Sequence, residues 1–510
     1  MSVPNKSIIK PTIQLTTFSI LGFAINLLSQ IVVANYFGSS IERDSFFLAT
    51  GISAFITFVF VGSFGNVFLP RLISITEDNQ KTEFILSSFI IVFTLSLIIV
   101  IILIAFIAPI VDIIAIDYGI SHKRLTQNLL ILLSPSILFN TLANMLNSLY
   151  YEKHRFMKPA IVLPIVAFVN LFALFALFPF WGIFSLSFGA LISSIVSVVL
   201  LAPIFYKKNF FSMKKFSLFN EHTNKYLNIV WPLLLLGLIS RMSTILERMF
   251  ATSLEVGSVS YLGYANQISL IVGTIAISGI GTSIYPRLAN LWSNNNLVEL
   301  TNQFRNISRF FFIIMIPIFI VILFLGNDVI KILFERGEFN HITTVAVSKT
   351  LIWYMFAMII RAELSFTTKI FFISGKTGIL SIISTLELII FVGIAYFLRV
   401  QFSYLGIAIS WFISNLFNYF ASLYYIKSKI LNIQIGELFY DLLKIIIVTF
   451  VSYGITFLLL NNLNIESTLL KVTCTGMLFV LIYIIIGNLV DINEIKYISN
   501  KFINKASRYF

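Results

Sequence analysis

Charged side chains stand inside several strongly apolar stretches of the sequence, and their chemistry is the most specific signal in the chain. Arg241, Glu247 and Arg248 fall in one stretch, and Arg361 and Glu363 fall in another. A charge at the centre of a membrane helix costs about 2.5–3.5 kcal/mol on insertion scales, so it usually faces a polar cavity or an opposite charge. Arginine also matches phosphate oxygens bidentately. This pattern favours a cationic cavity for a phosphorylated substrate.

The same charges have a structural interpretation, in which arginine and glutamate neutralise each other between helices. Glu247 with Arg361 is one such pair, and Glu363 is better explained as a charge partner than as a substrate contact. Arg241 and Arg248 are seven residues apart, so a helix presents both on nearly one face. We expect that face to be turned toward the central cavity, although Glu247 and Arg248 lie near the outer helix end, where water is within reach.

Uncharged polar residues recur within the apolar stretches and are candidates for lining a hydrated path. Asn266 and Gln267 are the candidates closest to a recognisable motif. For any single residue an interhelical hydrogen bond, worth about 0.6 kcal/mol on average, is the simpler interpretation. The others are Asn26, Gln30, Asn66, Asn415 and Asn418, and a further carboxylate, Glu387, is expected to be a charge partner.

Composition identifies the elements that must hold these residues. Hydrophobic residues make up 58% of the 510 positions and charged residues 11%, whereas soluble domains carry about 25% charged residues. The net charge of +13 comes from basic residues in short loops, which suits an anionic membrane surface rather than nucleic acid. One cysteine and four histidines predict neither a disulfide within the chain nor a zinc site, and we expect no metal or cofactor.

About fourteen apolar stretches are long enough to cross a bilayer core of about 30 Å as helices. Helices are required because lipid cannot satisfy backbone polar groups, and no alternating barrel pattern is present. Lys and Arg concentrate in the loops after even-numbered spans and in the two tails, which predicts cytoplasmic termini. The expected spans are 13–37, 46–69, 84–110, 126–149, 158–179, 182–206, 226–250, 259–285, 304–325, 345–372, 378–398, 404–425, 440–461 and 468–490.

The sequence also repeats itself at an offset of 216 residues. Residues 64–72 match residues 280–288, and both segments end in Pro-Arg-Leu at the same expected membrane face. Span two therefore corresponds to span eight, which predicts two six-helix lobes related by an axis along the membrane normal. Parallel repeats of this kind are typical of transporters whose substrate path lies between the lobes.

This repeat divides the all-α chain into four parts. The expected parts are an N-lobe (1–206), a basic linker (207–225), a C-lobe (226–428) and a C-terminal helix pair with a cytoplasmic tail (429–510). The linker has two interpretations, an amphipathic segment on the inner surface or an ordinary positive-inside loop.

Motifs of the common enzyme classes are missing from the sequence. There is no Gly-Lys-Ser/Thr phosphate loop, no His-Glu-x-x-His helix and no Gly-x-Ser-x-Gly elbow. We therefore expect a transporter rather than an enzyme. Its energy would come from an ion gradient, the membrane potential or substrate turnover.

Several short motifs, in order along essentially the whole chain, resemble the MurJ/MviN family of lipid II flippases. That family belongs to the multidrug/oligosaccharidyl-lipid/polysaccharide flippase superfamily. The motifs are Phe37-Gly38, Asp44-Ser45-Phe46-Phe47, Phe68-Leu69-Pro70, Asn144-Met145-Leu146-Asn147, Pro159-Ala160, Glu247-Arg248-Met249-Phe250-Ala251-Thr252-Ser253-Leu254, Gly257-Ser258-Val259-Ser260, Tyr264-Ala265-Asn266, Pro286-Arg287-Leu288 and Leu333-Phe334-Glu335-Arg336-Gly337-Glu338-Phe339.

The resemblance implies a fourteen-helix flippase in a bacterial plasma membrane. A polyprenyl-diphosphate-linked saccharide would pass through a cationic cavity by alternating access, and the last two helices would form a groove for its lipid tail. The family's cavity arginines do not carry over, because the aligned positions hold Phe23, Ser29, Thr57 and Gln267. Arg241 and Arg361 would then supply the charge from other helices.

Three alternatives to a lipid II flippase follow from these observations. A divergent relative would export a capsule, O-antigen or exopolysaccharide repeat unit on a similar lipid. A multidrug/cation antiporter would need a titrating cavity carboxylate, and the first lobe has no mid-span Asp or Glu. A membrane scaffold without transport activity would not need arginines at span centres.

Overall fold

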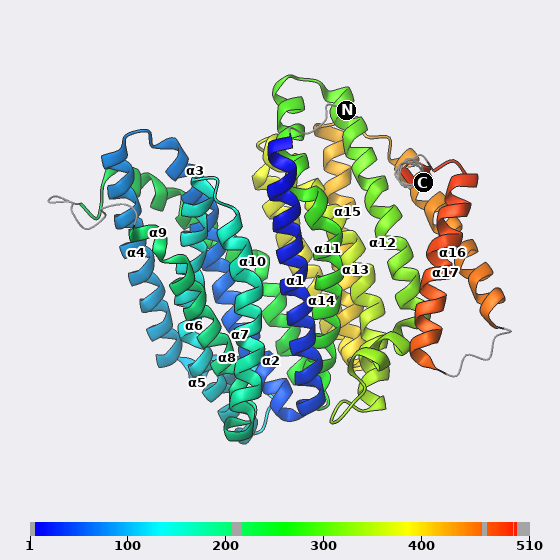
Figure 1. Ribbon diagram of the computed structural model, residues 1–510, viewed down its shortest axis with the longest axis horizontal. Coiled ribbons are helices and arrows are strands. Elements are labelled where there is room, and N and C mark those ends of the chain that lie inside the picture. Colours follow the sequence, from blue (N-terminus) through cyan, green and yellow to red (C-terminus); the bar gives the residue numbers. More distant parts are fainter. Residues whose placement is uncertain (1–5, 207–216, 462–466, 493, 497–510) are drawn as a thin grey trace. The chain divides into compact units, whose positions relative to one another are not determined.

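Helices account for the regular secondary structure of the described part of the chain (Figure 1). The computed structural model describes residues 6–206, 217–461, 467–492 and 494–496. Each of the fourteen expected spans coincides with a helix or with consecutive helices of this structure. The all-α fold class is therefore confirmed.

The first of two compact units comprises Met1–Ser260 together with Gly337–Phe339. Its helices extend from Lys6 to Thr252. They are α1 (Lys6–Phe37), α2 (Ile41–Phe60), the π-helix η1 (Val61–Gly65), α3 (Asn66–Ser74), α4 (Asp78–Ala105), α5 (Ile107–Ile114), α6 (Ile120–Glu152), α7 (Met157–Trp181), α8 (Phe184–Leu201), α9 (Pro203–Tyr206) and α10 (Glu221–Thr252).

The second unit comprises Tyr261–Arg336 and Asn340–Phe510. Its first helix, α11, begins at the end of the first unit. The helices are α11 (Ser258–Ser293), α12 (Leu297–Phe334), α13 (His341–Ile373), α14 (Thr377–Phe402), α15 (Tyr404–Lys429), α16 (Ile435–Asn461) and α17 (Thr468–Leu489).

Twelve helices within the described residues are long and apolar enough to cross a membrane. The helices α11 and α15 are not among these twelve, although they have 36 and 26 residues. In α15 the buried face carries several polar side chains, among them Asn415 and Asn418, which lower its apolarity. The protein is thus a multi-pass membrane protein, and the count of fourteen spans stays a prediction.

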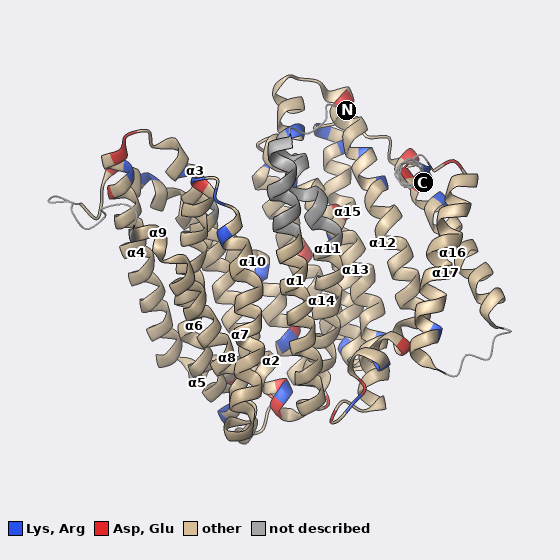
Figure 2. Ribbon diagram, in the orientation of Figure 1, with Lys and Arg blue, Asp and Glu red and all other residues tan. Residues whose placement is uncertain are grey.

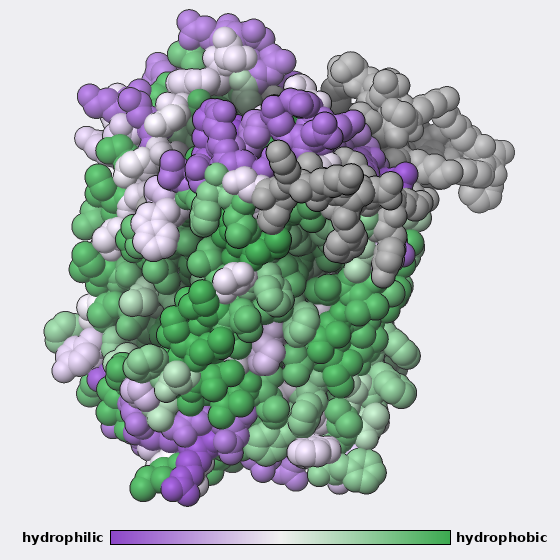
Figure 3. Space-filling model, turned by 90° about the vertical axis from the view of Figure 1, so that its left-hand side faces the viewer, coloured by the Kyte–Doolittle hydropathy of each residue, from purple (hydrophilic) through white to green (hydrophobic). Residues whose placement is uncertain are grey.

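Charge is distributed as a bilayer requires. Lysine, arginine and the carboxylates gather near the helix ends, and the middle of most helices carries few of them (Figure 2). On the face of the first unit seen in Figure 3, a broad hydrophobic band lies between hydrophilic ends. Such a band is suited to lipid, which solvates apolar side chains but not charges.

Asparagine side chains fix where three of these helices begin. The side-chain oxygens of Asn220, Asn296 and Asn340 accept hydrogen bonds of 2.9–3.1 Å from the backbone amide three residues later. These are N-caps of α10, α12 and α13, and each satisfies a backbone donor that the first helical turn leaves open.

The core of the first unit includes an aromatic cluster around Tyr226 of α10. The rings of Phe64, Phe68 and Phe84 lie 5.6–6.3 Å from the Tyr226 ring, centroid to centroid. The Tyr226 hydroxyl donates a 3.0 Å hydrogen bond to the Phe64 carbonyl oxygen. Aromatic packing of this kind ties α10 to α3, α4 and η1.

By its packing α10 belongs to the first unit, although the repeat assigns it to the C-lobe at 226–428. The repeat divides the chain by sequence similarity, whereas the two units are defined by which residues contact each other. The four-part division therefore stays a prediction. Within the expected linker, residues 207–216 lie outside the described residues.

Candidate substrate-binding residues

The two arginines of α10 both lie against α2. The Arg241 guanidinium carbon is 4.5 Å from the centroid of the Phe58 ring. The Arg248 guanidinium donates to the Phe47 carbonyl oxygen and also lies over the Phe47 ring. The shared face that their seven-residue spacing predicts is therefore present, and in this structure it is turned toward α2.

A glycine on α2 makes room for Arg248. A β-carbon added at Gly51 would lie 2.2 Å from Nε of Arg248. Any larger residue at this position would displace the guanidinium from the Phe47 carbonyl oxygen. This steric requirement has no signal in the sequence, because Gly51 and Arg248 are far apart along the chain.

Arg43 and Asp44 fall between the expected spans 13–37 and 46–69, and both are buried, at 1% and 3% exposure. Arg43 lies in the first turn of α2, with its guanidinium carbon 3.9 Å from the Phe47 ring centroid. It donates a 2.8 Å hydrogen bond to the Gln30 side-chain oxygen. The Phe47 ring thus interacts with both Arg43 and Arg248.

Asp44 caps the beginning of α11 from α2. Its carboxylate accepts hydrogen bonds of 2.7 Å from the backbone amides of Gly257 and Ser260, and a third from the Ser260 hydroxyl. A carboxylate is favoured there because a helix N-terminus carries a partial positive charge. Asp44 and Ser260 are 216 residues apart, which is the offset of the sequence repeat, so corresponding positions of the two copies touch.

In the second unit, Arg361 of α13 stacks on Trp411 of α15. The guanidinium carbon is 4.7 Å from the Trp411 ring centroid. Glu387 of α14 was expected to be a charge partner, and its carboxylate accepts a 2.5 Å hydrogen bond from the Asn418 side chain. Arg361, Glu387 and Asn418 thus place polar groups inside a bundle of apolar helices.

The two carboxylates named with the arginines are both buried. Glu247 is 4% exposed and Glu363 is 1% exposed. Glu247 and Arg361 belong to different units, so a pairing between them stays a prediction. Among the residues that the structure describes, no group of three His, Cys, Asp or Glu side chains is arranged to hold a metal ion.

Asn266 and Gln267 lie on α11 and are half-buried. The Gln267 side-chain oxygen is buried without a hydrogen-bond partner in the described part of the chain. Of the other positions where the family's arginines would align, Ser29 is 7% exposed, and the Thr57 hydroxyl donates to the Ser53 carbonyl oxygen at 2.8 Å. Neither of these two presents a charge to a substrate.

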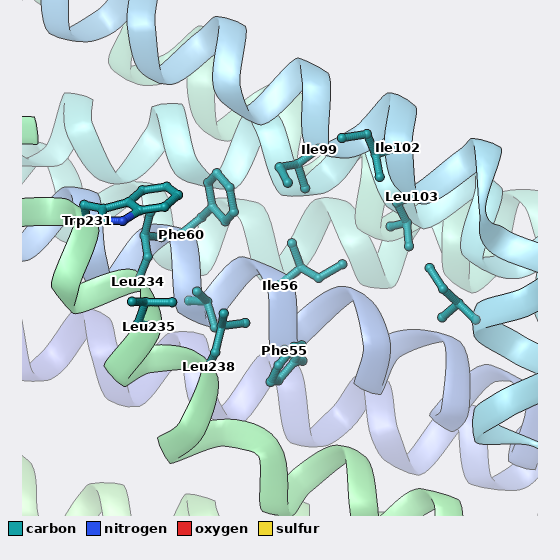
Figure 4. Close-up of a pocket in the computed structure, with 12 residues that line it drawn as sticks. Phe55, Ile56, Phe60, Ile99, Ile102, Leu103, Trp231, Leu234, Leu235 and Leu238 are labelled. Carbon is teal, nitrogen blue, oxygen red and sulfur yellow. The ribbon is translucent and has the colours of Figure 1, made fainter. Parts of the chain in front are cut away.

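An apolar crevice of about 320 Å³ runs between α2, α4 and α10 (Figure 4). Trp231, Leu235 and Leu238 of α10 line one side, and Ile99 and Ile102 of α4 line another. The lining is hydrocarbon nearly throughout, so the crevice offers nothing to hold a diphosphate or a sugar. We therefore exclude it as the candidate saccharide site.

Ion pairs fasten α16, and Glu494 beyond the end of α17, to α12. Arg305 Nε donates to Asp441 at 2.8 Å and its guanidinium also contacts Glu437. Arg309 reaches Asp441 at 3.6 Å and Glu494 at 3.1 Å. Asp441 is 6% exposed. It accepts a hydrogen bond from Arg305 and forms a longer ion pair with Arg309.

Comparisons with known proteins place this arrangement in a family. A family model described as "Lipid II flippase MurJ" matches residues 33–474. A probable lipid II flippase MurJ of Buchnera aphidicola is 25% identical over 473 residues, covering 90% of this chain and 91% of that protein. The corresponding protein of Aquifex aeolicus is 26% identical over 332 residues, with 64% of each chain covered.

Solved structures agree in fold. A lipid II flippase MurJ in an inward closed conformation superposes with a TM-score of 0.79 at 22% identity, covering 94% of this chain and 98% of that chain. An inward-facing multidrug resistance transporter of the MATE family gives a TM-score of 0.63 at 16% identity, with 81% and 95% covered. Both likenesses concern the fold alone.

Proposed function

This chain belongs to the MurJ family of lipid II flippases, and from that premise we propose that it moves a polyprenyl-diphosphate-linked saccharide from the inner to the outer leaflet of a bacterial plasma membrane. The first candidate is a lipid II-like peptidoglycan precursor. Transport proceeds by alternating access, with both termini in the cytoplasm, as the distribution of Lys and Arg indicates. The protein acts as a transporter and not as a catalyst.

One observation supports this function beyond family membership, namely the arginines held inside membrane helices. Arg241 and Arg361 each rest on an aromatic ring, Phe58 and Trp411 respectively. Cation–π contacts orient a guanidinium against the ring. Each guanidinium, within its own unit, suits a phosphate group, since arginine can bind phosphate oxygens bidentately.

Complementation tests the proposal. Cells depleted of their own lipid II flippase would express this protein, and growth and the lipid II exposed on the outer surface would be measured. We expect rescue by the unaltered protein and loss of rescue with Arg241→Ala or Arg361→Ala at normal membrane levels. Arg287→Ala is the control, because Arg287 is exposed, in a 3.9 Å ion pair with Glu299. Reduced membrane levels of the two variants would instead indicate that Arg241 and Arg361 form structural ion pairs and do not bind the substrate.

The positions at which the family's arginines are missing support an alternative substrate in place of lipid II. Phe23, Ser29, Thr57 and Gln267 carry no charge, so the saccharide differs from lipid II if those charges are required to recognise it. The alternative cargo is a capsule, O-antigen or exopolysaccharide repeat unit on the same lipid. Failure of complementation by a folded, membrane-inserted protein would favour this second substrate.

A further inference from the structure

Glu363 is a buried carboxyl group within the helices of the second unit. It lies on α13 and is 1% exposed. In the described part of the chain, neither of its carboxyl oxygens has a hydrogen-bond partner of normal geometry. It is therefore unlike Asp44, whose carboxylate accepts three hydrogen bonds, and unlike Asp441, which pairs with two arginines.

The groups that face Glu363 come from both helices packed most closely against α13. Ser308 of α12 presents its hydroxyl to the carboxyl group, and this hydroxyl also lacks a hydrogen bond of normal geometry. Tyr419 of α15 is close enough to interact electrostatically with Glu363. The facing groups are thus a hydroxyl and a phenol, both neutral.

The charged side chains nearby make other contacts. Arg361 is two residues from Glu363, which places the two on opposite sides of α13, and Arg361 stacks on Trp411. Lys369 of α13 lies over the Phe366 ring, with its ammonium nitrogen 4.6 Å from the ring centroid. On α14, Glu387 is hydrogen-bonded to Asn418.

Burial without a charge partner decides which form of the carboxyl group is stable. An ionised carboxylate taken out of water without compensation costs several kcal/mol even after the protein relaxes. A protonated carboxyl group avoids most of that cost, and it can donate to the Ser308 hydroxyl after a small rotation. Ionisable groups at membrane depth in transporters commonly serve as proton carriers.

We propose that Glu363 is a proton-binding site of the second unit, neutral in this conformation, which gives up its proton to water when a conformational change hydrates the carboxyl group. In a flippase, binding and release of this proton would link transport to a proton gradient. That link rests on the proposed function, whereas the bound proton does not.

Infrared spectroscopy of the purified full-length protein in lipid nanodiscs tests the bound proton without any transport. At pH 7 we expect a carbonyl stretching band of a protonated carboxylic acid that disappears in Glu363→Gln and remains in Glu387→Gln. Glu363→Asp should keep a shifted band, which guards against a misfolded glutamine variant. Absence of the band, or its loss in Glu387→Gln only, would overturn the assignment.

A flipping assay with an imposed proton gradient tests the link to transport. In the unaltered protein the gradient should raise the flipping rate, and Glu363→Gln should flip at the rate seen without a gradient. An equal response to the gradient in both proteins would overturn the link. If the unaltered protein flips no polyprenyl-linked saccharide at all, the proposed function fails, and the infrared result still decides the proton site.

Discussion

Arg248 occupies space that Gly51 leaves open, which makes the pair a test at the scale of single residues. Gly51→Ala should displace the guanidinium from the Phe47 carbonyl oxygen. A hydrogen bond from a charged donor contributes about 1.5–3 kcal/mol, so we expect a clearly lower unfolding temperature. Thermal unfolding of the purified protein in detergent measures this effect.

The double variant identifies the cause of that loss. If Gly51→Ala acts only through the guanidinium, adding it to Arg248→Ala should change little. Gly454→Ala on α16 is the control, since a β-carbon there meets nothing within 4 Å. Additive losses for Gly51→Ala and Arg248→Ala would contradict the packing described here.

Arg361 provides a residue-scale prediction about transport. Arg361→Lys keeps the charge but loses the planar guanidinium that stacks on Trp411. Lysine also cannot bind two phosphate oxygens bidentately, as arginine can. We expect flipping to fall by roughly tenfold, the equivalent of one charge-assisted hydrogen bond. Initial flipping rates at equal amounts of folded protein provide the measurement, and full activity of the lysine variant would argue against phosphate binding here.

At this scale the sequence indicated some charges inside helices and missed others. Charges inside apolar stretches made Arg241, Arg248, Arg361 and Glu363 candidates, and their roles stay predictions. Arg43 and Asp44 were missed because charged residues between two spans are normally solvated. One sequence signal for their burial was available, namely their position directly before an apolar run. Asp44 lies in the first turn of α2, and its carboxylate also caps the beginning of α11.

At the scale of elements, Asp441 contributes to the attachment of α16 to α12. Asp441→Asn leaves Arg305 and Arg309 without the carboxylate that both contact. Removing one partner of a buried pair costs about 3–5 kcal/mol, and we expect about 2–3 kcal/mol because the arginines are partly exposed. Faster limited proteolysis at the C-terminal helices would report this loosening.

A surface pair supplies the control for the proteolysis experiment. Lys225 and Glu221 form an i,i+4 ion pair on α10 with both side chains more than half exposed. Such pairs contribute little, so Glu221→Gln should leave the digestion rate unchanged. Equal rates for Asp441→Asn and the unaltered protein would show that the Asp441 ion pairs are not needed to hold α16.

The sequence predicted where helices lie along the chain better than it predicted which helices pack together. Each stretch that hydropathy predicted coincides with a helix or with consecutive helices, because the bilayer core sets both the length and the composition of a span. It could not assign α10 to a unit, since that depends on Tyr226 packing among Phe64, Phe68 and Phe84. Contacts between aromatic side chains far apart in sequence have no periodic signature.

At the scale of the whole molecule, the sequence repeat has a physical trace in the structure. Asp44 and Ser260 occupy corresponding positions of the two copies and are hydrogen-bonded to each other. Their separation of 216 residues equals the offset between residues 64–72 and 280–288. The two-lobe division stays a prediction, and the proposed alternating access depends on it.

The central claim is that this protein carries a polyprenyl-diphosphate-linked saccharide across the bilayer. The most direct measurement reconstitutes the purified protein in vesicles that contain fluorescent lipid II on the inner leaflet, and follows its arrival outside. We predict flipping well above that of protein-free vesicles, and its loss with Arg241→Ala and Arg361→Ala together. No flipping of lipid II or of any other polyprenyl-diphosphate saccharide by folded protein would contradict the claim.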